Sequence, residues 1–391
     1  TPVAGVRGLG ASFDMAQAVS WKDGIVNQLT GGVEALLRKA KVRVIRGRAD
    51  LRDGKTAMVH GDTGTQMIRA EVLVLATGSE PVELPMLPFG GAILSSSDAL
   101  ALTDLPKSLA VVGGGYIGLE LGTAFAKLGA AVTVIEAGDR ILPAWDADLT
   151  APVAQSLKQL DVQVVTQARA EGFRDGVLSV RQNDQTLPIT ADRVLVTAGR
   201  RPRSQAAGIA GLNLDMDGPF LRIDECCRTS MQGVFAIGDI TGEPMLAHRA
   251  MAQGEMVAEL VAGRARKWDH RAIPAVCFTD PEIVSVGLLP EAAVTRGPVK
   301  VAEFPFAANG KALSDHRGDG FVRIVSDAAG REILGIQAVG AGVAELASGF
   351  ALAVEMGATL ADIAATIHAH PTRGEAFHEA ALRALGHALH I

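Results

Sequence analysis

The sequence contains few of the residues that build disulfide or metal scaffolds. Only three cysteines occur among its 391 residues, and they are Cys226, Cys227 and Cys277. None belongs to a Cys-x-x-Cys pair or stands at metal-ligand spacing from a histidine. This pattern excludes a disulfide-rich scaffold and the common zinc motifs. We therefore expect three ordinary thiols and no metal site.

Long apolar runs and an excess of positive charge are also lacking. No run reaches the length that a bilayer-spanning helix needs, and the first ten residues, TPVAGVRGLG, do not resemble a signal peptide. The net charge of -6 argues against nucleic acid as a partner. These features predict a cytoplasmic protein that acts without nucleic acid or membrane as a partner.

The length and composition favour a globular protein with more than one domain. A chain of 391 residues, of which 48% are hydrophobic and 20% are charged, exceeds what one ordinary core holds. Strands and helices alternate in the first two thirds of the chain. From about residue 272 the pattern changes to a mixture of strands and helices that is typical of an α+β domain.

The most informative motif lies at residues 109–120, LAVVGGGYIGLE. A buried apolar strand at 109–112 is followed by Gly113, Gly115 and Gly118 in G-x-G-x-x-G spacing, and then by a helical pattern through Leu128. The three glycines permit a tight turn, close backbone approach to a pyrophosphate, and close helix–strand packing. Phosphates bind favourably at such a helix N-terminus. The motif predicts a dinucleotide-binding site. The alternative is a glycine-rich turn that has the same sequence pattern but no function.

Glu136 follows a second apolar strand at 131–135. An acid about 20 residues after the glycine motif accepts hydrogen bonds from the ribose diol of NAD. Its negative charge repels the 2′-phosphate of NADP. We therefore expect NAD rather than NADP.

The remaining pattern predicts further elements in chain order. Helices are expected at 12–40, 148–160, 245–263 and 343–356, and after Pro371. Strands are expected at 42–45, 72–75, 162–165, 194–196, 284–286, 299–304, 321–325 and 333–339, with hairpin turns at Asp53–Gly54 and Gly61–Asp62. Pro81, Pro85 and Pro88 indicate irregular structure before the glycine motif.

Several segments together resemble a known family. VVGGGYIGLE, TAGRRPR, VFAIGD, MLAH and HAHPT occur in the order and spacing of the FAD-dependent pyridine nucleotide–disulfide oxidoreductases. The resemblance implies an α/β fold with two Rossmann-like nucleotide-binding domains, the FAD domain incomplete and the NAD domain inserted, and a C-terminal α+β dimerisation domain. It places the FAD domain at 1–105 and 226–270, the NAD domain at 106–225 and the dimerisation domain at 271–391.

The resemblance also implies which residues contact the cofactors FAD and NAD. Tyr116, the only tyrosine, is expected to cover the flavin, and Glu120 to lie near the nicotinamide; packing and an exposed helix position are the plainer interpretations of these two residues. Asp239 is expected at the ribityl chain, or else in an Asx turn, and the start of the following helix at the flavin ring. The full set comprises Gly47, Ala49, Thr77, Gly78, Ser79, Asp239, Met245, Leu246, Ala247 and His248 for FAD, and Gly113, Gly115, Tyr116, Ile117, Gly118, Glu120, Glu136, Ala168 and Gly199 for NAD.

His370 and Glu375 are the candidates for acid–base catalysis. In the family a Glu orients the imidazole that takes a proton from a dithiol substrate. Thr372-x-x-Glu375 is also a capping box, which alone accounts for Glu375 structurally. Arg373 stands where a Leu is common in relatives, and we expect it to alter the substrate entrance. His368 is assigned no catalytic role.

Within the family the chain is most similar to members that oxidise protein-bound dihydrolipoamide and reduce NAD. These members imply a homodimer and, as a partner, the lipoyl-bearing acyltransferase subunit of a 2-oxo acid dehydrogenase complex. Glutathione reductase, mercuric reductase, a soluble transhydrogenase and a non-catalytic nucleotide-binding fragment remain alternatives. Glu136 opposes the NADP-dependent reductases, and residues 380–391 lack the paired cysteines expected of mercuric reductase.

Two features of the family are not found in the sequence. Its members begin with a separate glycine motif for FAD and a Cys-x4-Cys redox disulfide, and this chain has neither. Thr1 also stands where an initiator Met is expected. The resemblance therefore predicts that a segment preceding Thr1 carries both features.

Overall fold

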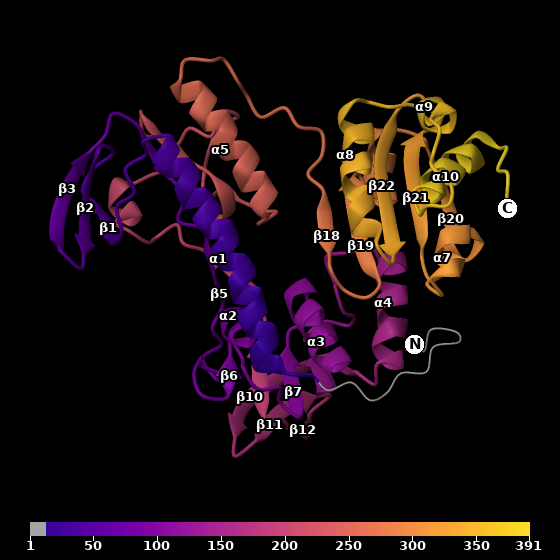
Figure 1. The fold of residues 1–391 in the computed structure, drawn as a ribbon, viewed down its shortest axis with the longest axis horizontal. Coiled ribbons are helices and arrows are strands. Elements are labelled where there is room, and N and C mark those ends of the chain that lie inside the picture. The colour runs from indigo at the N-terminus through magenta and orange to yellow at the C-terminus, as the bar shows by residue number, and fades with distance from the viewer. Residues whose placement is uncertain (1–12) are drawn as a thin grey trace.

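The computed structural model describes residues 13–391, which form three lobes (Figure 1). The first lobe contains the long helix α1 and helix α5, the second contains the glycine motif, and the third is the C-terminal part of the chain. No helix in this range combines the length and the apolar character that crossing a bilayer requires.

The second lobe is a Rossmann-like unit built on a five-stranded parallel sheet in the order β6-β13-β7-β8-β9. Strand β7 is buried because four of its five residues are apolar and helices cover the sheet. A three-stranded antiparallel sheet, β10-β11-β12, is attached to it. The elements are β6 Ile93–Leu94, α2 Ser96–Leu100, β7 Ser108–Val112, α3 Tyr116–Leu128, β8 Ala131–Ile135, α4 Ala147–Gln159, β9 Gln163–Val165, β10 Ala168–Arg174, β11 Val177–Gln182, β12 Gln185–Thr190 and β13 Arg193–Val196.

The first lobe joins two distant parts of the chain, since β4 pairs in parallel with β17 and β5 pairs with β14. None of the residues of α1 is buried among the described residues. The elements are α1 Met15–Lys39, β1 Arg48–Leu51, β2 Thr56–Gly61, β3 Gly64–Arg69, β4 Leu73–Leu75, β5 Ser79–Pro81, β14 Arg200–Pro202, η1 Ile209–Leu212, β15 Met216–Asp217, β16 Phe220–Leu221, β17 Val234–Ala236, η2 Gly238–Thr241 and α5 Ala247–Val261.

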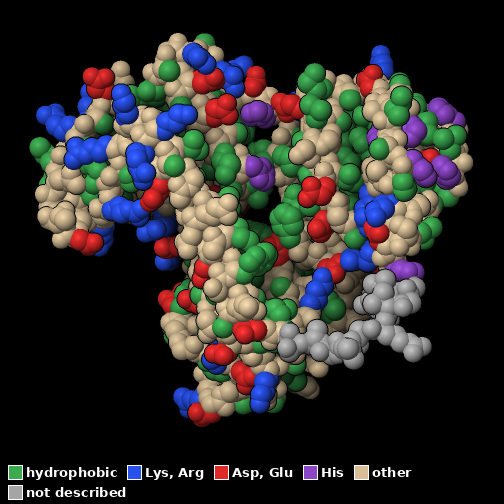
Figure 2. All heavy atoms as spheres, viewed as in Figure 1, with side chains coloured by type: hydrophobic (Ala, Val, Ile, Leu, Met, Phe, Trp, Pro, Cys, Tyr) green, Lys and Arg blue, Asp and Glu red, His purple; other side chains and the backbone are tan. Residues whose placement is uncertain are grey.

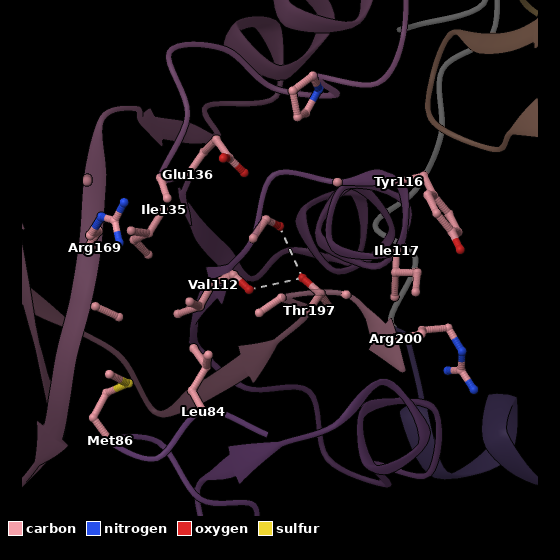
Figure 3. Close-up of a pocket in the computed structure, with 18 of the residues that line it drawn as sticks. Leu84, Met86, Val112, Tyr116, Ile117, Ile135, Glu136, Arg169, Thr197 and Arg200 are labelled. Atoms are coloured by element: carbon pink, nitrogen blue, oxygen red, sulfur yellow. Dashed lines mark hydrogen bonds between the residues drawn. The ribbon is translucent and has the colours of Figure 1, made fainter. Parts of the chain in front are cut away.

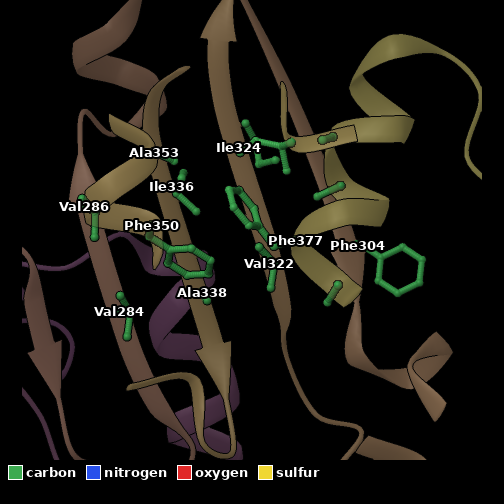
Figure 4. Packing of buried hydrophobic residues seen from close by; sticks show 14 of the residues in the cluster. Val284, Val286, Phe304, Val322, Ile324, Ile336, Ala338, Phe350, Ala353 and Phe377 are labelled. Carbon is green, nitrogen blue, oxygen red and sulfur yellow. The ribbon is translucent and has the colours of Figure 1, made fainter. Parts of the chain in front are cut away.

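The third lobe is a five-stranded antiparallel sheet in the order β18-β19-β22-β21-β20, with helices packed on it. Figure 4 shows its core, where the rings of Phe350 and Phe377 meet edge to face at 5.0 Å. The elements are β18 Ala275–Cys277, β19 Glu282–Gly287, α6 Pro290–Ala293, η3 Val294–Arg296, β20 Val299–Pro305, η4 Phe306–Ala308, α7 Gly310–Ser314, β21 Phe321–Asp327, β22 Ile333–Gly340, η5 Val343–Leu346, α8 Ala347–Glu355, α9 Leu360–Ala365 and α10 Glu375–Leu385.

Most expected elements are present, but two expectations were wrong. Residues 42–45 form no strand, because no neighbouring strand within residues 13–391 pairs with them, and Val42 and Val44 are exposed. The predicted helix at 343–356 begins as the 3₁₀ turn η5 and becomes α-helical only at Ala347. Periodicity alone does not separate these two helix types.

Candidate functional site

The glycine motif borders a cavity of about 560 Å³ at the carboxyl ends of the parallel strands. Figure 3 shows Glu136 and Arg169 on one side of it and Tyr116 and Arg200 on the other. Of the expected NAD residues, seven line the cavity: Gly113, Gly115, Tyr116, Ile117, Glu136, Ala168 and Gly199.

The three glycines of the motif stand in different steric surroundings. A Cβ on Gly118 would lie 2.3 Å from the carbonyl oxygen of Gly113, so this position must be glycine for α3 to pack on β7. Gly113 has φ +113, and its Cβ would lie 2.4 Å from the Thr197 carbonyl oxygen. A Cβ on Gly115 would meet nothing within 4 Å. The space beside Gly115 is therefore free for a ligand that approaches the backbone closely.

The start of helix α3 fits a pyrophosphate. Gly115 is its N-cap and provides no side-chain hydrogen bond, so the amides of the first turn remain available. The helix has 13 residues and its N-terminus carries the positive end of the dipole. This free helix start and the open space at Gly115 show that the residues present fit a bound dinucleotide.

Glu136 is held in place by the backbone of its own cavity. Its two carboxylate oxygens accept hydrogen bonds from Gly114 N–H and Gly138 N–H, each at 2.6 Å. Each oxygen keeps a second lone pair, so the carboxylate can still accept a hydrogen bond from a ribose hydroxyl. The geometry thus fits the NAD preference that the sequence predicts.

Sequence reasoning assigned no role to Thr197 or to the loop before α4. The Thr197 hydroxyl lies 3.1 Å from the Gly113 carbonyl oxygen and 3.2 Å from that of Val112, and it lines the cavity (Figure 3). The Leu142 N–H donates to the Gly114 carbonyl at 2.8 Å and so fixes the glycine loop from the other side. Thr197 is the first residue of TAGRRPR, one of the segments that carry the family resemblance. No sequence motif indicated Leu142, because its hydrogen bond to Gly114 depends on how the loop before α4 folds back onto the glycine motif.

Glu120 lies outside this cavity. Its carboxylate accepts a hydrogen bond from Phe278 N–H at 2.8 Å, on the side of α3 that faces the third lobe. Burial raises the pKa of Glu120, and the Phe278 hydrogen bond only partly opposes this effect. The structure therefore separates Glu120 from the seven residues that line the dinucleotide cavity. Gly118 does not line it either, because it packs against the strand.

Six of the ten expected FAD residues lie at η2, at the start of α5 or in contact with η2, namely Asp239, Met245, Leu246, Ala247, His248 and Ser79. Asp239 Oδ2 accepts a 2.5 Å hydrogen bond from the Ser79 hydroxyl, which itself accepts one from Arg200 Nε at 2.8 Å. The other oxygen of Asp239 has no partner among the described residues. Helix α5 has Leu246 as N-cap without a side-chain bond, so the amides of its first turn are available. These groups fit a flavin with its ribityl hydroxyls, and Met245, Ala247 and His248 lie at the same helix start.

The remaining FAD candidates have local partners. The Thr77 hydroxyl donates to the Arg203 carbonyl at 2.9 Å, and Arg203 N–H donates to the Gly78 carbonyl at 2.9 Å. Gly47 packs on β2, where a Cβ would lie 2.6 Å from the His60 carbonyl oxygen, and Ala49 pairs with Val59. None of these four residues lines the dinucleotide cavity.

His370 and Glu375 form a pair in a separate cavity of about 630 Å³ in the third lobe. His370 Nδ1 lies 2.8 Å from Glu375 Oε1, and Glu375 Oε2 accepts from Thr372 N–H at 2.8 Å. Burial raises the pKa of Glu375, but hydrogen bonds from Thr372 and His370 outweigh it and lower the pKa. Figure 2 shows histidines gathered near α10 and the C-terminus.

The predicted capping box is only half present. The Glu375 carboxylate accepts from Thr372 N–H, but the Thr372 hydroxyl donates to the Ala369 carbonyl at 2.7 Å instead of capping the helix. Helix α10 begins at Glu375 with Gly374 as its N-cap, two residues later than a helix capped by Thr372 would begin. His368 stacks on the ring of His378 at 5.1 Å and lies near the Thr366 carbonyl.

Comparisons with known proteins agree with this geometry. A family model described as pyridine nucleotide-disulphide oxidoreductase matches residues 5–254, and the model of the corresponding dimerisation domain matches residues 273–381. The chain is 55% identical to a dihydrolipoyl dehydrogenase of Pseudomonas aeruginosa, over 99% of this chain and 84% of that protein. It is 43% identical to one of Geobacillus stearothermophilus with the same two coverages.

A solved structure gives the same result for the fold. LpdA from Mycobacterium tuberculosis superposes with a TM-score of 0.88 at 27% identity, over 95% of this chain and 84% of that one. The comparisons do not confirm the segment expected before Thr1; they cover nearly all of the present chain. The chain belongs to the pyridine nucleotide–disulphide oxidoreductase family.

Proposed function

We propose that this protein oxidises protein-bound dihydrolipoamide to lipoamide and passes the electrons through FAD to NAD. The observation that carries the proposal is the His370–Glu375 pair, in which the imidazole Nδ1 is hydrogen-bonded to the carboxylate and the ring borders a cavity. The relatives at 55% and 43% identity, both named dihydrolipoyl dehydrogenase, support the same reaction.

The pair is arranged to take a proton from a thiol. The ionised Glu375 carboxylate can only accept hydrogen bonds, so His370 Nδ1 must donate and Nε2 carries the free lone pair. Because 79% of the imidazole side chain is exposed, Nε2 can reach a substrate thiol. Removing that proton produces the thiolate, which is the nucleophile in thiol–disulfide exchange. The carboxylate faces the positive charge that the imidazole then gains.

The cofactors are FAD and NAD, and when bound they supply the hydride chemistry. Gly113, Gly115 and the first turn of α3 would hold the NAD pyrophosphate, and Glu136 its ribose. For FAD, Asp239 and the first turn of α5 would hold the ribityl chain and the flavin ring. Tyr116 stands at the rim of the dinucleotide cavity, and burial raises its pKa.

The three thiols of the chain do not act as the disulfide that accepts the substrate electrons. All three are free, and burial raises the pKa of Cys227 and of Cys277 to about 11. Such thiols stay protonated at neutral pH and are poor nucleophiles.

The test compares the two half-reactions in a form of the protein that carries the family's redox disulfide. His370→Gln should lower dihydrolipoamide oxidation by about 10²–10⁴, the usual share of general acid–base catalysis. Reduction of the flavin by NADH should persist, because it needs no proton from a thiol. Glu375→Gln should give a smaller loss than His370→Gln. Equal loss in both half-reactions would show that His370 only maintains the structure, and the function would have to be revised.

The quaternary structure and partners follow from the same proposal. We infer a homodimer joined through residues 271–391, which the match to a dimerisation domain supports. The lipoyl-bearing acyltransferase subunit of a 2-oxo acid dehydrogenase complex is the proposed partner. A monomer by light scattering at micromolar concentration would refute the dimer. The domain boundaries 1–105, 106–225, 226–270 and 271–391, and a cytoplasmic location, stay predictions.

A further inference from the structure

The turn that carries His370 is tied to helix α7 at both ends of that helix. Asn309, the N-cap of α7, donates from Nδ2 to the Thr372 carbonyl at 3.0 Å. Asp315, the C-cap, lies 2.9 Å from Arg373 Nη2 through Oδ2. Thr372 and Arg373 lie between His370 and Glu375 in sequence, so a five-residue helix holds the segment between the base and its carboxylate partner.

Asn309 performs two tasks with its two amide atoms. Its Oδ1 accepts from Ala312 N–H at 2.9 Å and caps α7, while its Nδ2 holds the Thr372 carbonyl. The residue is 3% exposed, so water does not replace either bond freely. A rotation of the side chain would therefore break the cap of α7 and release the Thr372 carbonyl together.

Arg373 is held in a single place by its surroundings. Its side chain is only 17% exposed, and its stem lies beside Gly342, where a Cβ would be 3.9 Å from Arg373 Cδ. Nε is buried without a hydrogen-bond partner among the described residues. An orphaned buried donor is costly, which indicates that packing and the Asp315 ion pair together keep the guanidinium here.

The charges around this contact also favour one arrangement. Asp315 binds Lys311 Nζ at 2.9 Å as well as Arg373, and hydrogen bonds from these two cations, Lys311 the stronger, lower the pKa of Asp315. The carboxylate is thus ionised at neutral pH and bridges α7 to the turn. Arg317 is occupied elsewhere, since it pairs with Asp280. The bridge between α7 and the turn therefore depends on Arg373 itself.

From these contacts we propose that Asn309 and Arg373 are positioning residues that fix the orientation and the tautomer of His370. The inference rests on the proposed function, in which His370 is the base. Neither residue is required to touch substrate. If the turn shifts, His370 Nδ1 and Glu375 Oε1 lose their 2.8 Å alignment, and Nε2 is no longer the free nitrogen in every molecule.

The experiment uses the FAD-loaded dimer and four variants. Asn309→Asp keeps the oxygen that caps α7 but removes the donor to Thr372. Arg373→Leu removes the ion pair and the buried donor, and Arg373→Lys keeps a positive charge. Arg383→Leu is the matched control, because Arg383 makes one comparable bond in the same lobe, to the Glu303 carbonyl at 2.9 Å.

The first readout is the tautomer of His370, followed by NMR of histidine labelled at the imidazole and assigned with His370→Gln. The unchanged protein and Arg383→Leu should show one tautomer with the proton on Nδ1. Asn309→Asp and Arg373→Leu should show a mixture. Arg373→Lys should lie closer to the unchanged protein. The second readout is dihydrolipoamide oxidation, which should fall roughly 10- to 100-fold in Asn309→Asp and Arg373→Leu through lost orientation, with flavin reduction by NADH unchanged.

A single Nδ1–H tautomer and an unchanged dihydrolipoamide rate in Asn309→Asp would overturn the inference, as would equal effects in Arg383→Leu. If Arg373→Leu does not fold, Asn309→Asp still tests the inference, because aspartate is nearly isosteric with asparagine. The inference and the function fail in different ways. If His370→Gln slows only the dihydrolipoamide half-reaction while the positioning variants change nothing, the base assignment stands and the positioning role falls.

Discussion

His370 Nδ1 lies 2.8 Å from Glu375 Oε1, although the two residues play different parts in the fold. Glu375 is the first residue of α10 and binds the backbone of its own turn, whereas the His370 side chain is 79% exposed. The hydrogen bond thus joins a fixed carboxylate to an exposed imidazole. Because the proposed function gives Glu375 a chemical role beside its structural one, stability and activity must be measured separately in its variants.

Glu375 should make stability depend on pH in a defined direction. The pKa of Glu375 in the folded state lies below the ordinary value for a glutamate, because hydrogen bonds from Thr372 and His370 outweigh the opposing effect of burial. A carboxyl group whose pKa is lowered on folding stabilises the fold at pH values above its pKa in the unfolded chain. This contribution to stability is lost as the pH falls through the pKa of the group in the folded protein. The difference in thermal midpoint between the unchanged protein and Glu375→Gln should therefore shrink between about pH 6 and about pH 3.

Asp362 offers a positive control for this measurement. Its carboxylate closes a full capping box with Thr359, and hydrogen bonds from the Thr359 backbone and hydroxyl lower its pKa. The difference in thermal midpoint between the unchanged protein and Asp362→Asn should also shrink as the pH falls. A midpoint difference for Glu375→Gln that stays constant across this range, while that of Asp362→Asn changes, would contradict the expectation.

Glu136 should determine the choice between NAD and NADP. Its carboxylate is fixed by Gly114 and Gly138 and lines the dinucleotide cavity. Glu136→Ala removes a charge-assisted acceptor worth on the order of 1.5–3 kcal/mol, which corresponds to about a 10- to 100-fold weaker NAD affinity. Calorimetric titration with both nucleotides should show a smaller ratio of NAD affinity to NADP affinity in Glu136→Ala than in the unchanged protein. An unchanged protein that binds NADP as tightly as NAD would disprove this role.

The sequence predicted the parts of the molecule that depend on local pattern. The strand, glycine turn and helix at 108–128 agree because the apolar run, the glycine spacing and the helical pattern are all local to this segment. The strand expected at 42–45 failed because a strand also needs a partner, which a local pattern does not reveal. The tie between Asn309 and Thr372 spans 63 residues, so it depends on tertiary packing and was not predicted.

Gly115 and Gly118 should respond differently to alanine. A Cβ at position 118 would clash with Gly113, the Thr197 hydroxyl and Val111, at 2.3, 2.5 and 2.9 Å, so Gly118→Ala should destabilise the fold by roughly 1–3 kcal/mol. At position 115 the space is open, so Gly115→Ala should leave the thermal midpoint nearly unchanged and weaken NAD binding instead. Equal loss of stability in the two variants, measured by thermal unfolding, would contradict the assignment of separate roles.

Arg323 should hold the second and third lobes together. The side chain is 3% exposed and donates to Asp146 and Asp148 at 2.7 Å, both at the start of α4, and to Glu303 at 2.6 Å on β20. Arg323→Met removes all three bonds. Asp148 and Glu303 can turn to water, since their side chains are 72% and 42% exposed, which limits the cost to about 1–3 kcal/mol.

The matched control is Arg271→Met, which removes a surface pair with Glu332 at 2.8 Å and should change stability by less than about 1 kcal/mol. Arg323→Met should lower the thermal midpoint and increase protease cleavage near residues 137–146, in the loop that precedes α4. Cleavage should rise there because α4 and the third lobe are no longer joined by a buried cation. If Arg323→Met and Arg271→Met have equal midpoints and equal cleavage rates, the buried ion-pair cluster does not join the lobes, and apolar contacts between α4 and β22 carry the interface alone.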